Sequence, residues 1–171
     1  MDLASENMTR TIYLIRHAEA ASKEPMQTDL QRELTTNGKQ DAQMAGIYLK
    51  NKGVIFDLVL CSPAIRTQTT AQLITINMSD SSTNVTIVPS IYHATDDDLF
   101  TILRNLPLGK KSVALIGHNP SISWFASSLT NSKIEAFSPC TIAAFQFEIE
   151  NWTELRLQTG RLDFIHSPSI F

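Results

Sequence analysis

Cysteine is scarce in this chain of 171 residues, which contains only Cys61 and Cys140. Two cysteines are too few for a disulfide framework or a structural zinc site. Both lie in apolar stretches of sequence, so we expect two reduced thiols packed inside the protein.

Long apolar runs and an excess of basic residues are also missing. No run approaches the roughly 20 residues needed to span a bilayer, and residues 1–7 are acidic and polar, without the apolar core of a signal peptide. Fourteen Lys and Arg against 17 Asp and Glu give a formal net charge of −3. We therefore expect a cytoplasmic protein that binds neither nucleic acid nor membrane. A small anionic substrate is still compatible, because a pocket can be positive inside an acidic protein.

The composition is otherwise that of an ordinary globular protein, with 43% hydrophobic and 18% charged residues. No internal repeat and no linker divides the chain. We predict a single domain over residues 1–171, in which residues 1–9 form a flexible N-terminal segment.

Strand-like apolar runs alternate with helical periods along the chain. Strands are predicted at Thr11–Ile15, Asp57–Cys61, Val85–Val88, Val113–Ile116, Thr141–Ile149 and Glu154–Thr159. Helices are predicted through Ala42, Ala45 and Leu49 up to a C-cap at Gly53, and after Ser62-Pro63, Thr95 and Asn119-Pro120. This order predicts a three-layer α/β domain with a mostly parallel central sheet, helices on both faces and an antiparallel C-terminal strand pair.

Histidines and arginines follow three of the predicted strands. The first strand ends in Arg16-His17, the second leads into a helix whose first turn holds Arg66, and the central strand is followed by His118. Ligands of open α/β sheets bind beyond the carboxyl ends of the strands, so we expect these side chains to meet. A cation is disfavoured in the first turn of a helix, and a bound anion would explain Arg66 there.

Each of these residues also has an ordinary explanation. A lone histidine at a strand end is more often a satisfied polar residue than a catalyst, Arg66 alone could snorkel to solvent, and Arg16 could pair with Glu19. A metal site is disfavoured, because no third acid or thiolate accompanies the two histidines and the arginines would repel a divalent cation. Their joint placement favours a site that binds a phosphoryl group.

Four motifs, in this order, resemble the histidine phosphatase superfamily, which is phosphoglycerate mutase-like. They are Leu14-Ile15-Arg16-His17-Ala18-Glu19, Leu34-Thr35-Thr36-Asn37-Gly38, Cys61-Ser62-Pro63-Ala64-Ile65-Arg66-Thr67-Gln68-Thr69 and Gly117-His118-Asn119-Pro120. The short chain, without a large helical insertion, is similar to the compact bacterial phosphohistidine phosphatase branch. The resemblance implies that His17 attacks phosphorus, that Arg16, Arg66 and His118 bind the phosphoryl oxygens, and that the reaction is metal-independent and uses no organic cofactor.

Further assignments follow from the resemblance. Arg32 is similar to a third arginine of the compact branch, and Arg32 and Asn119 are predicted to bind substrate. The chain departs from the family in having Ala18 where many members have glycine. Many members also place a glutamate proton donor after the third strand, where this chain has His93. His93 is therefore a candidate general acid, alongside the alternative that it is a loop residue and another group donates the proton.

The predicted reaction is hydrolysis of a phosphoryl group in two steps, through a phosphohistidine at His17. A phosphohistidine on a protein is the favoured substrate, because so short a chain lacks an inserted lid to enclose a small molecule. A phosphomonoesterase acting on a sugar or nucleotide phosphate is the alternative, and a mutase is disfavoured because it must protect its intermediate from water. A catalytically silent phosphate-binding module is also compatible, although binding alone needs only the arginines and not His17 and His118.

Overall fold

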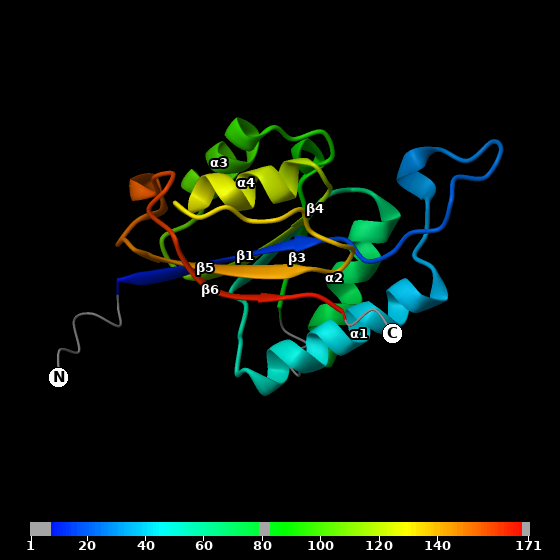
Figure 1. The fold of residues 1–171 in the computed structure, drawn as a ribbon, viewed down its shortest axis with the longest axis horizontal. Helices are drawn as coiled ribbons and strands as arrows, with labels where there is room; N and C mark the ends of the chain where they lie inside the picture. The colour runs from blue at the N-terminus through cyan, green and yellow to red at the C-terminus, as the bar shows by residue number, and fades with distance from the viewer. Residues whose placement is uncertain (1–7, 79–82, 169–171) are drawn as a thin grey trace.

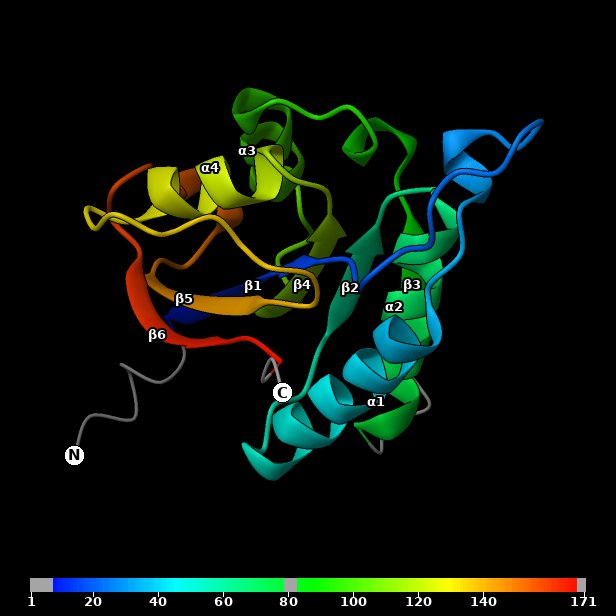
Figure 2. The same ribbon diagram turned by 45° about the vertical axis from the view of Figure 1, so that its right-hand side comes forward.

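A six-stranded sheet with helices on both faces forms the body of the protein (Figures 1 and 2). The computed structural model describes residues 8–78 and 83–168. The strands are β1 (Thr9–Arg16), β2 (Leu58–Cys61), β3 (Val85–Ile87), β4 (Ser112–Gly117), β5 (Ile142–Glu148) and β6 (Arg161–His166). Their order is β3-β2-β4-β1-β5-β6, with β1 to β4 parallel and the last two strands antiparallel. The predicted fold class is confirmed.

Two helices cover each face of the sheet. The helices are α1 (Thr36–Asn51), α2 (Ile65–Asn77), α3 (Asp96–Arg104) and α4 (Ser121–Leu129), and short 3₁₀ turns span Asp29–Gln31, Pro89–Ile91 and Trp152–Glu154. Thr95 caps α3 through a capping box with Asp98, as its position predicts. None of the helices within residues 8–78 and 83–168 is long and apolar enough to cross a membrane.

Residues 12–15 of β1 are buried on both faces of the sheet, which explains their unbroken apolar sequence. Ile12 and Leu14 belong to the core cluster under α3 and α4, whereas Tyr13 and Ile15 belong to the cluster under α1 and α2. Successive side chains of a strand point to opposite faces, so β1 contributes to both cores. The strand that carries His17 at its end is therefore firmly held.

Gly38 brings the start of α1 against the loop that follows His17. Thr35 caps α1 by accepting a hydrogen bond from the Gly38 N–H at 3.0 Å, and the Thr35 N–H donates to the Glu19 carbonyl at 3.0 Å. A side chain at position 38 would overlap that same carbonyl oxygen. Glycine is thus required for this close approach, which fixes the backbone just beyond the nucleophile candidate.

The structure corrects several predicted boundaries. Ala64 caps α2 instead of Ser62, because Ser62 and Pro63 stay outside the helix and the Ser62 hydroxyl accepts the Ala64 N–H. The segment predicted as a strand at 154–159 is a turn, and the last strand is β6. Trp152 starts this turn: it is buried, and its indole N–H donates to the Lys110 carbonyl at 2.6 Å.

The predicted N-terminal segment is shorter than expected within the described residues. Thr9 already belongs to β1, and the Met8 carbonyl accepts a hydrogen bond from the Ile149 N–H at 2.9 Å. Residues 1–7, which make up most of the predicted N-terminal segment, lie outside the described residues, as do residues 79–82.

Candidate active site

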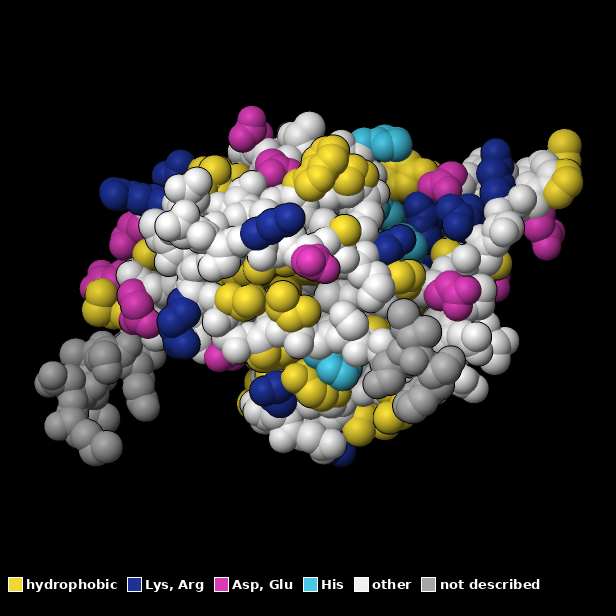
Figure 3. All heavy atoms as spheres, viewed as in Figure 1, with side chains coloured by type: hydrophobic (Ala, Val, Ile, Leu, Met, Phe, Trp, Pro, Cys, Tyr) yellow, Lys and Arg dark blue, Asp and Glu magenta, His cyan; other side chains and the backbone are white. Residues whose placement is uncertain are grey.

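The carboxyl ends of three neighbouring parallel strands bring the predicted residues together. In the order β2-β4-β1, Arg16 at the end of β1 is level with Gly117 at the end of β4, and α2 begins shortly after β2. A pocket of about 300 Å³ opens at this edge and is lined by Arg16, His17, Asp29, Arg32, Arg66, Tyr92, His93, His118 and Asn119. All seven predicted site residues line it. Figure 3 shows arginine and histidine side chains gathered in this hollow, beside the segment between β1 and α1 that projects from the body of the protein.

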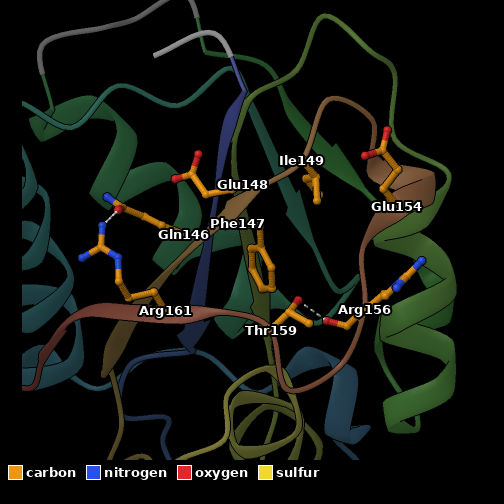
Figure 4. Close-up of a pocket in the computed structure, with 8 residues that line it drawn as sticks. All are labelled: Gln146, Phe147, Glu148, Ile149, Glu154, Arg156, Thr159 and Arg161. Carbon is orange, nitrogen blue, oxygen red and sulfur yellow. Dashed lines mark hydrogen bonds between the residues drawn. The ribbon is translucent and has the colours of Figure 1, made fainter. Parts of the chain in front are cut away.

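A larger pocket, of about 440 Å³, lies at the opposite end of the sheet (Figure 4). Its lining includes Glu148, which pairs with Thr9 at the start of β1, far along the strand from Arg16. The lining holds Arg156 and Arg161 but no histidine, and Arg161 bonds to Gln146. Its greater volume does not make it the reaction site, because the nucleophile candidates lie at the other end.

The ring of His17 is fixed in one tautomer. Its Nδ1 lies 2.7 Å from the carbonyl oxygen of Ala18, which can only accept, so Nδ1 carries the proton. The backbone of His17 is held on both sides, by its N–H to the Gly117 carbonyl at 3.1 Å and by its carbonyl from the Cys140 N–H at 3.1 Å. The Nε2 atom, with its lone pair, has no hydrogen-bond partner within the described part of the chain.

Alanine after His17 is compatible with the turn. Ala18 is fully buried and does not have a positive φ, so an L side chain fits there without strain. Its N–H donates to the Thr70 hydroxyl at 3.0 Å, and that hydroxyl donates to the Arg66 carbonyl at 2.7 Å. The loop after His17 is thus tied to the first turns of α2, which carries Arg66.

Two histidines of the pocket, His17 and His118, are kept neutral at pH 7. Burial, and then the nearby charges of Arg66, Arg16 and Arg32, lower the pKa of His17 to about 4. Burial and the neighbouring His17 and Arg66 lower the pKa of His118 to about 3. The two rings lie 5.2 Å apart, and Nε2 of His118 is hydrogen-bonded to the Ser62 hydroxyl at 2.7 Å.

Two arginines of the pocket have donors that the protein leaves unused. Arg16 donates from Nη1 to the Phe137 carbonyl at 2.7 Å, and Arg66 donates from both terminal nitrogens to Asp29. The Nε atoms of Arg16 and Arg66 are buried and have no hydrogen-bond partner among the described residues. Buried donors are nearly always paired. Two unpaired guanidinium N–H groups in one pocket therefore indicate a ligand that accepts hydrogen bonds.

Asp29 and Tyr92 also line the pocket, and sequence reasoning missed both. The Asp29 carboxylate accepts from Arg32 Nη1 at 3.0 Å, from Arg66 Nη2 at 2.8 Å and from the Tyr92 hydroxyl at 2.5 Å. The hydrogen bonds from Tyr92 and from the arginines hold the pKa of Asp29 well below its usual range. Asp29 lies in a polar stretch of sequence, and Tyr92 resembles an ordinary core residue. The sequence therefore offers no reason to assign either residue to the site.

His93 and Asn119 lie at the edge of the pocket in different ways. His93 is exposed and has no hydrogen bond to the described residues, with its ring 4.2 Å from that of Tyr92. Asn119 donates to the Phe137 carbonyl at 2.9 Å and accepts from the Ser123 hydroxyl at 2.6 Å. Because Arg16 shares the Phe137 carbonyl, Asn119 supports the loop behind Arg16. The predicted roles of both residues stay predictions.

This constellation defines a class of site. A neutral imidazole with a free lone pair lies among three guanidinium groups at the carboxyl edge of a parallel sheet. Such an arrangement has the nucleophile and the charge that phosphoryl transfer through a histidine requires.

Known proteins resemble this chain in sequence and in fold. Residues 12–90 match the histidine phosphatase superfamily (branch 1). An uncharacterized chloroplastic protein of Arabidopsis thaliana is 28% identical over 165 residues, which cover 91% of this chain and 75% of that protein.

The structure of a candidate phosphohistidine phosphatase, SixA of Nakamurella multipartitia, superposes with a TM-score of 0.82 and 25% identity, over 95% of this chain and 98% of that one. The protein histidine phosphatase SixA complexed with tungstate gives a TM-score of 0.80 and 23% identity, over 92% and 97% of the two chains. Over residues 12–90 the chain therefore resembles the histidine phosphatase superfamily, and it has the compact fold of the SixA structures.

Proposed function

We propose that this chain is a phosphatase that removes the phosphoryl group from a phosphohistidine on a protein, through a covalent intermediate at His17. The observation that carries this proposal is the state of the His17 ring. Its Nδ1–H is held by the Ala18 carbonyl, so Nε2 keeps its lone pair, and the low pKa of about 4 keeps that lone pair free of a proton at neutral pH.

The first step transfers the phosphoryl group to the enzyme. His17 Nε2 forms a bond to phosphorus while the bond from phosphorus to the substrate imidazole breaks. The substrate imidazole leaves as a neutral ring when its other nitrogen already carries a proton, so this step needs no general acid. Arg16, Arg66 and Arg32 stabilise the charge on the equatorial oxygens, with His118 beside them.

The second step hydrolyses the intermediate. Water attacks phosphorus, the bond to His17 Nε2 breaks, and inorganic phosphate leaves with the oxygen of the water while the neutral imidazole is restored. Figure 3 shows histidine and arginine side chains of the pocket at the molecular surface. This exposure supports access by water and by a phosphohistidine on the surface of another protein. Cys61 and Cys140 are both free and buried, which supports a cytoplasmic location.

Rapid acid or base quenching of the enzyme with a phosphohistidine peptide tests this proposal. We expect an acid-labile, base-stable phosphoryl adduct that is absent from His17→Ala, because the substitution removes the covalent route. His166→Ala is a matched control, since His166 does not line the pocket, and it should form the adduct normally.

Three other outcomes would contradict the proposal in different ways. An adduct on another residue would remove His17 as nucleophile. Faster turnover of sugar or nucleotide phosphates than of the peptide would favour a small-molecule phosphomonoesterase. Phosphate binding without turnover of either substrate would indicate a binding module.

A further inference from the structure

The phosphoryl pocket contains a carboxylate of its own. Both oxygens of Asp29 are bound: Oδ1 accepts from Arg32 at 3.0 Å, and Oδ2 accepts from Arg66 at 2.8 Å and from Tyr92 at 2.5 Å. Asp29 also accepts a hydrogen bond from Arg66 Nη1 at 2.7 Å through its backbone carbonyl. Two of the three pocket arginines are thus ion-paired to the same residue.

These contacts fix the orientation of the Arg66 guanidinium. Asp29 holds Nη1 and Nη2 through two oxygens, so the planar guanidinium cannot rotate without losing both bonds. Of the other N–H donors of Arg66, the one on Nε is buried and has no partner among the described residues. Without Asp29, Arg66 and Arg32 would be two like charges close together, and each would be free to turn away.

The same contacts also set the charge of the pocket. Arg16, Arg32 and Arg66 are cationic, and His17 and His118 are neutral at pH 7. The Asp29 carboxylate offsets one of the positive charges. The remainder is balanced by a phosphoryl dianion, so free phosphate is held less tightly than three uncompensated arginines would hold it.

Resting on the proposed function, we propose that Asp29 is a positioning residue that orients Arg66 and Arg32 toward the phosphoryl group and limits the affinity for free phosphate. Orientation acts on the transition state, whose equatorial oxygens need donors at fixed places. The offset charge acts on ground-state phosphate binding. Neutralising Asp29 should therefore raise the affinity for free phosphate and lower kcat. Because these two quantities change in opposite directions, the two roles of Asp29 can be measured separately.

Calorimetric titration with inorganic phosphate and steady-state kinetics together test this. For Asp29→Asn we expect phosphate to bind about tenfold more tightly, because one nearby negative charge is gone. We expect kcat to fall by about 10–10²-fold, because the carboxylate that holds Arg32 and Nη2 of Arg66 is gone. Asp97→Asn, the same change at an exposed carboxylate outside the pocket, should leave both values as in the wild type.

The variant Asp29→Glu separates the effect of the carboxylate charge on phosphate binding from the effect of the contacts to Arg66 on kcat. Its carboxylate restores the charge, so phosphate affinity should return to near the wild-type value. Its longer side chain cannot reproduce both the side-chain and the backbone contacts to Arg66, so kcat should stay low. Weaker phosphate binding by Asp29→Asn in proportion to its lower kcat would overturn the proposal, since a merely structural residue behaves in that way. Unchanged kcat in Asp29→Asn would overturn it as well.

The phosphate titration keeps this inference distinct from the proposed function. Phosphate binding by calorimetry needs no turnover. A wild-type protein that binds phosphate but hydrolyses no phosphohistidine would contradict the proposed function, while the affinity of Asp29→Asn would still decide the role of Asp29 in the pocket.

Discussion

Two histidines that line the pocket, His17 and His93, differ in how they are surrounded. His17 is enclosed, and burial with three arginines nearby keeps its ring neutral, which suits a nucleophile. His93 is exposed at the edge of the same pocket and has no hydrogen bond to the described residues. An exposed imidazole at the edge of the pocket is accessible to a leaving group. The surroundings of each ring therefore agree with the different roles that the sequence predicts for them.

Replacement of His93 should affect substrates according to their leaving groups. An alkoxide leaving group needs a proton, and a positioned general acid contributes about 10²–10⁴-fold to such a reaction. A protonated phosphohistidine releases a neutral imidazole without help. His93→Ala should therefore lower kcat/KM for alkyl phosphate esters by about 10²-fold or more and leave that for a phosphohistidine peptide nearly unchanged, as measured with both substrates on one enzyme preparation.

His93→Gln serves as a second variant, because it keeps a polar side chain of similar reach but cannot donate an acidic proton. It should behave like His93→Ala on esters. Equal, small losses on both substrate types would show that His93 is an ordinary loop residue.

At the scale of elements, the start of α1 determines the backbone after His17. Gly38 lies against the Glu19 carbonyl with no room for a methyl group. Gly38→Ala must push α1 away from the loop, at a cost of about 1–3 kcal/mol in the free energy of unfolding. Because the loop carries Ala18, whose carbonyl holds His17, we also expect lower kcat. Chemical denaturation and steady-state kinetics measure the two effects.

Gly109→Ala is the matched control for this prediction. A side chain at position 109 would meet nothing within 4 Å, and Gly109 does not have a positive φ. Its stability should stay the same or rise slightly, because alanine restricts the unfolded chain. A Gly38→Ala variant as stable and active as Gly109→Ala would show that α1 adjusts without disturbing the loop.

The strands that carry the site could be predicted from the sequence. The contacts made by the loops between these strands could not. Strands β1, β2 and β4 are apolar on both faces, and the residues that follow them stand out against such runs. Asp29 could not be found in this way, because its importance comes from contacts with α2 and with Tyr92. Strand β6 was also missed: the sequence 154–159 has strand-like residues, but the burial of Trp152 and Leu155 holds it in a turn.

For the molecule as a whole, the neutral histidines have a thermodynamic consequence. The pKa values of His17 and His118, about 4 and about 3, lie below the usual 6.5 of the unfolded chain. Between pH 6.5 and 4 the unfolded state therefore binds protons that the folded state does not, so stability must fall as the pH is lowered through this window. The loss should be on the order of 2 kcal/mol for the pair, after allowance for solvent screening.

Denaturant unfolding at several pH values checks this expectation. The double variant His17→Asn, His118→Gln lacks both titrating groups, so its stability should fall less between pH 6.5 and 4 than that of the wild type. Parallel curves for the two proteins would mean that these histidines are protonated equally in the folded and unfolded states.

The position of β1 in the sheet also determines when the site can exist during synthesis. The ribosome releases β1 first, but both of its neighbours in the sheet, β4 and β5, emerge much later. Even the backbone of His17 depends on them, through Gly117 and Cys140. Pairing over such separations is slow compared with local folding. A nascent chain therefore carries the complete Arg16-His17 motif long before the pocket around it has formed, and under the proposed function we expect hydrolysis to begin only when β5 has joined the sheet.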